Sequence, residues 1–294
     1  MFHNSFMEHF THRNYKDCHI HVIPLDRIKD EFKRALLPKT SKTYKEICSS
    51  PKKLVETMDN ANLEKVAIMS YPSPETHGMG MELVYFVIDY CSGYRDRLYP
   101  VGSVHPSMDV KDIITHLEKQ YSDIAAIKLH PVHQHFKPND YREEERGLKS
   151  LEVIYEFASD NNLSILFHTG TSILPNARVK FGDPLYLDDV ANDFPKLNII
   201  MSHGGRPFWM DKAFFIMRRF KNVWLDISGI PPKRLLDYFP RFEIIAERCI
   251  YGSDLPSPGV KGLKENLEEF LSLPISKELK EKIAVKNFDK IYRT

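Results

Sequence analysis

The segment DCHIH (17–21) lies in a short apolar run near the start of the chain and determines how the later runs are interpreted. Residues two apart on a strand point to the same side, so His19 and His21 share one face. Later runs of the same character end at His168 in LFHTG, His203 in MSHGG and Asp254 in YGSDLP. Imidazoles and a carboxylate at such positions suit a divalent metal that keeps one position open for water.

The composition limits the class of protein. The chain has 294 residues, of which 42% are hydrophobic, and this fits one large domain or two medium ones. Its 41 Lys and Arg nearly balance 40 Asp and Glu, so the charge predicts neither a nucleic-acid nor a membrane partner. The four cysteines form no CxxC pair, and the N-terminus lacks the pattern of a signal peptide. We expect a cytoplasmic protein with reduced thiols.

Eight short apolar runs rich in β-branched residues are spread along the chain. Several are apolar throughout instead of alternating, which is typical of parallel strands buried on both faces. The expected strands are 17–23, 65–70, 98–104, 124–130, 164–168, 198–203, 223–228 and 249–254.

Segments with the helical spacing of apolar residues separate these runs. The expected helices are 51–62, 82–92, 109–120, 148–161, 185–193, 207–219, 232–238, 262–271 and 276–290. Eight strand–helix units in this length predict an α/β fold, a (β/α)8 TIM barrel over about residues 16–290 of a single domain, 1–294. A doubly wound open sheet is the alternative, but no GxGxxG or P-loop pattern follows any run.

Three connections are longer than β–α loops usually are. They are 25–50 after the first strand, 132–147 after the fourth and 171–184 after the fifth. In a barrel all three would lie at the C-terminal ends of the strands, so we expect them to be active-site loops.

The motifs DCHIH, IKLHP, LFHTG, MSHGG and YGSDLP together resemble the motif set of the amidohydrolase superfamily. The resemblance is greatest to the amidohydrolase-related branch that includes aminocarboxymuconate-semialdehyde decarboxylase and resorcylate-type decarboxylases, and it covers about residues 16–290. It implies a TIM barrel with a metal at the C-terminal mouth. By position, the resemblance makes His19, His21, His168 and Asp254 the ligands of one ion. It places His203 beside the metal-bound water, either as a general acid or base or as an electrostatic anchor.

Zinc(II) suits this set of three nitrogens and one oxygen best, although manganese(II) and iron(II) also fit it. Lys128, in IKLH, leaves a second arrangement open. In binuclear relatives such as phosphotriesterase, a carboxylated lysine on the fourth strand bridges two metals, and His203 would then bind the second ion. The branch that the chain resembles typically carries one metal, so we expect one ion.

Other residues are candidates for the surroundings of the ion. Arg206 follows the MSHGG motif and either holds a substrate carboxylate or forms a surface salt bridge. His130 and Lys128 are candidates for contact with substrate, and a structural role for His130 is equally consistent with its place before a proline. Asp17 is expected to support the metal-binding strand, whereas Asp226 contacts substrate or belongs to the barrel wall.

Two reactions use the same ligands. In the first, a metal-activated water attacks a small ester, amide or lactone, with Asp254 and His203 as catalytic residues. The second is non-oxidative decarboxylation of an unsaturated or aromatic carboxylic acid. A barrel that has lost catalysis and only binds is a third possibility, against which the complete ligand set argues. The expected partner is a small molecule such as a carboxylate, and a homodimer is the commonest oligomer.

Overall fold

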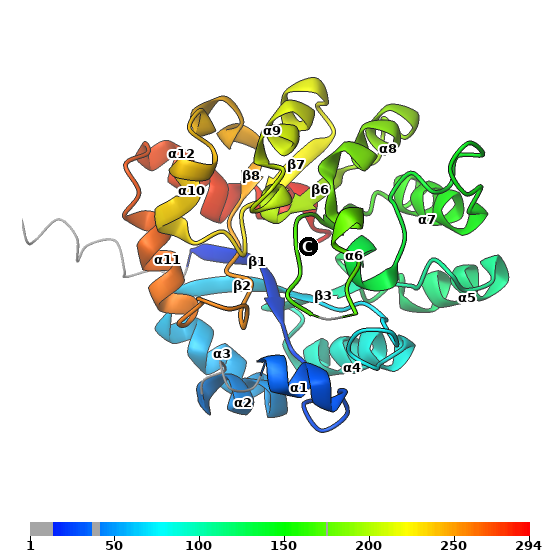
Figure 1. Cartoon of the computed structure of the whole chain (residues 1–294). Coiled ribbons are helices and arrows are strands. Elements are labelled where there is room, and N and C mark those ends of the chain that lie inside the picture. Colours follow the sequence, from blue (N-terminus) through cyan, green and yellow to red (C-terminus); the bar gives the residue numbers. More distant parts are fainter. Residues whose placement is uncertain (1–13, 37–41, 175) are drawn as a thin grey trace, which may run out of the picture.

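A computed structural model describes residues 14–36, 42–174 and 176–294. Its eight parallel strands pair in chain order and form a nearly closed barrel surrounded by helices (Figure 1). The strands are β1 (Tyr15–His21), β2 (Leu63–Met69), β3 (Leu98–Gly102), β4 (Ala126–Leu129), β5 (Ile165–His168), β6 (Ile199–Ser202), β7 (Val223–Asp226) and β8 (Cys249–Ile250). The predicted (β/α)8 barrel is confirmed.

The eighth strand is shorter than predicted, because only two residues of the expected 249–254 pair with β7. Beyond them the chain turns towards β1 and closes the barrel by other bonds. Tyr251 O accepts from Cys18 N at 2.9 Å, and Asp254 N donates to His19 O at 2.8 Å. Asp254 has a φ of 62°, which takes it out of the strand conformation. The closing segment therefore carries a predicted site residue directly beside the DCHIH strand.

Helices surround the strands, most of them on the outside of the barrel (Figure 1). They are α1 (Asp30–Leu36), α2 (Lys42–Ser49), α3 (Pro51–Asn60), α4 (Met81–Cys91), α5 (Val110–Gln120), α6 (Pro131–Gln134), α7 (Lys149–Asp160), α8 (Leu187–Asp193), α9 (Met210–Arg219), α10 (Leu235–Tyr238), α11 (Leu263–Leu271), α12 (Lys277–Glu281) and α13 (Phe288–Ile291).

The structure corrects several predicted helix bounds. The expected loop 25–50 contains α1 and α2, and α2 buries Tyr44, Ile47 and Cys48. The expected helix 207–219 begins only at Met210, because residues 203–205 form a tight turn with positive φ values. The expected helix 276–290 divides into α12, a wider turn over 282–286 and α13.

The C-terminal end of the chain closes the barrel opposite the site. Phe288, Ile291 and Tyr292 belong to a buried cluster with inward-facing residues such as Leu166 and Ile200. Tyr292 Oη donates to Cys18 O at 2.8 Å, which ties this end to β1. In Figure 1 the C-terminus accordingly lies near the centre of the ring of strands. Packed side chains fill this side, and the cavity described below lies at the C-terminal ends of the strands.

None of the described helices is long and apolar enough to cross a membrane. The N-terminal stretch used for the signal-peptide prediction lies mostly within 1–13, outside the described residues.

Candidate metal centre

Three of the predicted ligands form a triangle of donor atoms. His19 Nε2 and His21 Nε2 are 3.2 Å apart, so the two side chains share one face as their spacing predicts. Asp254 Oδ1 is 3.6 Å from His19 Nε2 and 3.5 Å from His21 Nε2. Ligands bound at about 2.0–2.1 Å around a tetrahedral ion lie about 3.4 Å apart. The spacing of these donors therefore fits a single ion between them.

Asp226, at the end of β7, holds the ring of His19. Its Oδ2 is 2.6 Å from His19 Nδ1, and both side chains are fully buried. Burial alone would raise the pKa of Asp226, but the adjacent His19 outweighs it and lowers the pKa. An ionised Asp226 accepts a hydrogen bond from Nδ1–H of His19. The lone pair of His19 Nε2 then faces the triangle. A carboxylate behind a ligating histidine is a recurrent feature of metal sites.

His203 and Asp254 sit in strained backbone conformations. Their φ values are 69° and 62°, which non-glycine residues rarely adopt outside functional or tightly constrained sites. His203, His19 and Asp254 each offer a ligand atom within 4.8 Å of the others. His203 Nδ1 lies 2.8 Å from Ser228 O and donates to it. Burial lowers the pKa of His203 to about 3, so its imidazole is neutral with the Nε2 lone pair free.

His168 ends β5 as predicted, but it lies to one side of the triangle. Its ring centroid is 4.9 Å from that of His203, and it stacks on His130 at 3.9 Å. Its Nε2 atom is buried and has no hydrogen-bond partner among the described residues. A buried polar atom without a partner is unusual in a folded protein. An ion bound by this nitrogen would satisfy it, so the residue fits a metal site.

Asp254 is held by several neighbours besides the histidines. Ser257 Oγ donates to its Oδ2 at 2.5 Å, and Arg206 Nη2 lies 3.7 Å from the same oxygen. Burial would raise the pKa of Asp254, but the nearby His203 and His21 lower it well below its usual value. Arg206 therefore does not lie in a solvent-exposed salt bridge, because its partner is a buried carboxylate of the site.

Lys128 and Asp17 lie beneath the site. Lys128 is buried and its Nζ donates to Ser202 Oγ at 3.0 Å, while burial lowers its pKa to about 8. Asp17 Oδ1 accepts from the backbone N–H groups of His19 and Ser253 at 2.9 and 3.0 Å. Asp17 therefore supports the DCHIH strand by fixing its backbone, as the sequence predicts.

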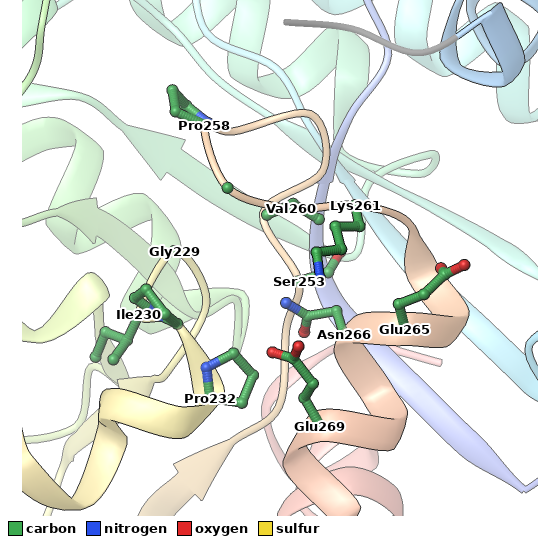
Figure 2. Close-up of a pocket in the computed structure, with 12 residues that line it drawn as sticks. Gly229, Ile230, Pro232, Ser253, Pro258, Val260, Lys261, Glu265, Asn266 and Glu269 are labelled. Atoms are coloured by element: carbon green, nitrogen blue, oxygen red, sulfur yellow. The ribbon is translucent and has the colours of Figure 1, made fainter.

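A cavity of about 430 Å³ opens above these residues, within the usual range for small-molecule sites. The predicted site residues line it together with apolar side chains such as Phe32, Leu174 and Tyr238. A second pocket of about 40 Å³ lies behind the loops that follow β7 and β8 (Figure 2). The two share Gly229, Pro231 and Pro258 in their walls.

Three residues that the sequence did not single out as site residues line the same cavity. They are Tyr71 after β2, His133 in α6 and Ser172 after β5. The sequence placed His133 in the loop 132–147, either facing the substrate or solvated, and the structure places it in the cavity wall. No motif marks these residues, because they meet only when three separate loops are assembled.

A family model described as "Amidohydrolase" matches residues 17–294, nearly the whole chain. No curated protein sequence matches the chain. Among solved structures, the chain is similar to an uncharacterised TIM-barrel protein from Bordetella bronchiseptica. That structure is 22% identical, has a TM-score of 0.73, and the alignment covers 94% of this chain and 98% of that one.

Two further solved structures share the fold. One is a probable 2-pyrone-4,6-dicarboxylic acid hydrolase from Acinetobacter baumannii with citric acid bound, at 16% identity and a TM-score of 0.66, covering 95% of this chain and 98% of that one. The other is a dihydroxybenzoic acid decarboxylase from a Polaromonas species with manganese and 2-nitroresorcinol bound, at 13% identity and a TM-score of 0.64, covering 95% and 96%. The match of the family model over the whole barrel shows that this chain belongs to the amidohydrolase family.

Proposed function

We propose that this protein is a metal-dependent hydrolase that acts on a small ester, amide or lactone. In this proposal His19, His21, His168 and Asp254 hold one divalent ion, most suitably zinc(II), although manganese(II) and iron(II) fit the same donors. The spacing of 3.2–3.6 Å among three of the donor atoms is the observation that carries the proposal. The unpartnered buried Nε2 of His168 supports the fourth ligand.

When bound, the ion would lower the pKa of a coordinated water and polarise an oxygen of the substrate. The chain supplies the proton transfer. Asp254 is ionised because its pKa is lowered, so it presents a carboxylate oxygen that can accept a hydrogen bond from the attacking water. His203 is neutral and carries its proton on Nδ1, so its Nε2 can accept a second hydrogen bond or a proton. We assign both as catalytic residues.

Several of the histidines that line the cavity are neutral. Burial lowers the pKa values of His21, His130, His168 and His203. These imidazoles are therefore neutral, and each has a ring nitrogen with a lone pair that can bind an ion or accept a hydrogen bond. Lys128 Nζ donates to Ser202 Oγ, and the proposal takes one ion with this lysine unmodified.

Decarboxylation of an unsaturated or aromatic acid is the second candidate. Arg206 lines the cavity beside Asp254 and can hold a substrate carboxylate bidentately. Apolar side chains such as Phe32 and Leu174 line other parts of the wall and suit a flat ring. A similar fold is also found in structures of 2,6-dihydroxybenzoate decarboxylase.

One experiment separates the two candidates. Zinc-loaded protein is assayed against a panel of esters, amides and lactones by acid release, and against aromatic acids by release of CO2. We expect zinc-dependent hydrolysis that falls by about 10²–10⁴-fold in Asp254→Asn. The matched control, Asp237→Asn, changes an exposed carboxylate outside the cavity and should keep the wild-type rate. Release of CO2 without hydrolysis would support the second candidate, and metal-independent turnover would contradict both.

A further inference from the structure

A chain of hydrogen bonds runs along one wall of the cavity. Tyr71 Oη lies 2.9 Å from His133 Nδ1, and His133 Nε2 lies 2.8 Å from Ser172 Oγ. All three side chains line the cavity, and both Tyr71 and His133 are buried. None of the three belongs to the metal ligand set proposed above. The contacts within this series of hydrogen bonds determine which atom donates in each of them.

The donor and the acceptor of each hydrogen bond follow from the protonation states of Tyr71 and His133. Burial raises the pKa of Tyr71, so the phenol keeps its proton, and His133 Nδ1 is its only acceptor among the described residues. With Tyr71 as the donor, His133 Nδ1 carries a lone pair. Burial also lowers the pKa of His133 well below its usual value, so the ring is neutral. Its one proton is then on Nε2, which donates to Ser172 Oγ.

Ser172 is left as a donor only. A hydroxyl has two lone pairs and one hydrogen. Its Oγ accepts from His133 Nε2 at 2.8 Å and from Leu174 N at 3.3 Å, so both lone pairs are used. The hydroxyl hydrogen has no acceptor among the described residues and lies in the cavity wall. Ser172 can therefore bind a ligand that presents an oxygen acceptor, and it cannot accept from a ligand hydroxyl or amine.

His130 provides a second donor in the same part of the wall. Its Nδ1 accepts from the backbone N–H of His133 at 3.2 Å, so its ring proton must be on Nε2. Its ring stacks on His133 with centroids 3.7 Å apart. His130 also lines the cavity. The side chain of His133 thus orients Ser172, and its backbone N–H orients His130.

We propose that Ser172 Oγ–H and His130 Nε2–H form a donor subsite for an oxygen of the ligand, with Tyr71 and His133 as the positioning residues that fix its direction. The ligand oxygen is a carboxylate, carbonyl or phenolate oxygen. A metal cation or a protonated amine is excluded at this position, because donors would face donors. The proposal refines the specificity of the cavity and rests on the proposed function only in taking this cavity as the substrate site.

The direction of the chain is tested without metal or turnover. Nitrogen-15 NMR of histidine-labelled protein distinguishes the two neutral tautomers of an imidazole, and the His133→Gln variant identifies the His133 signals. We expect the Nε2–H tautomer in the wild type and an appreciable Nδ1–H population in Tyr71→Phe, which lacks the fixing donor. A wild-type His133 that is protonated on Nδ1, or on both nitrogens near neutral pH, would overturn the proposal.

The ligand class is tested by calorimetry with benzoate, an acceptor-only probe whose ring suits the apolar walls. We expect Ser172→Ala to weaken benzoate binding by about tenfold or more, and Ser172→Thr, which keeps a hydroxyl donor, to bind like the wild type. Ser122→Ala, an exposed serine outside the cavity, is the matched control. Equal affinity in Ser172→Ala, or a wild type that does not bind benzoate up to its solubility limit, would overturn the assignment. Neither the NMR measurement nor the benzoate titration depends on turnover, so a failed hydrolysis assay would not change the interpretation of either.

Discussion

The bond between Asp226 and His19 offers the sharpest perturbation of the proposed metal centre. Asp226 uses both oxygens, because Oδ1 accepts from Ser228 N at 2.8 Å and Oδ2 accepts from His19 Nδ1 at 2.6 Å. In Asp226→Asn, the remaining oxygen is needed by Ser228, so the amide NH₂ faces His19 Nδ1. This donor moves the His19 proton to Nε2, the atom that should bind the metal.

The expected magnitude follows from the burial of the pair. Both side chains are fully buried, so water cannot replace the lost bond. A hydrogen bond to a buried charge contributes about 1.5–3 kcal/mol, which corresponds to a loss of about 10–100-fold in zinc affinity. Competition with a chromophoric chelator measures that affinity. Asp237→Asn makes the same chemical change at an exposed position and should bind zinc like the wild type. Wild-type affinity in Asp226→Asn would refute the argument.

Two further predictions follow from the same contacts. A Cβ added at Gly229 would lie 2.7 Å from Asp254 Oδ2 and 2.8 Å from His203 Nδ1, at a φ of 64°. Gly229→Ala should therefore lose metal by elemental analysis, while Gly93→Ala, where a Cβ meets nothing within 4 Å, should retain it. The pKa of buried His203 is about 3, which is below the value of about 6.5 for a histidine in the unfolded chain. Other buried neutral histidines are shifted in the same direction. The unfolded chain then binds more protons than the folded protein below pH 6.5. The free energy of unfolding should therefore decrease as the pH is lowered, by up to about 1.4 kcal/mol per pH unit for each such histidine. Urea unfolding of metal-free protein at pH 7.5 and 5.5 checks this, and equal stabilities would contradict it.

The sequence predicted the barrel, and it placed the candidate site residues near the ends of predicted strands, because both inferences depend on local patterns. Buried parallel strands are short and apolar, and the residues that end them meet at one mouth of the barrel. His19 and His21 are two apart on one strand, so their shared face follows directly from strand geometry. The same reasoning located His168 at the end of β5, whereas His203 directly follows β6 and Asp254 lies four residues beyond β8.

The contacts that orient these residues could not be predicted in this way. Asp226 bonds His19 across 207 positions of the chain, and this requires the relative register of β7 and β1. The left-handed conformations of His203 and Asp254 carry no distinctive sequence signal, because neither residue is a glycine. The chain from Tyr71 through His133 to Ser172 joins three loops, so no spacing within one segment indicates it.

The metal content of the purified protein tests the central claim most directly. Elemental analysis compares the wild-type protein with a His19→Gln, His21→Gln double variant, which lacks two of the proposed metal ligands. The arrangement predicts one equivalent of a divalent transition metal in the wild type and none in a folded double variant. A wild type without metal after reconstitution with zinc, or a double variant that binds zinc as tightly, would contradict it.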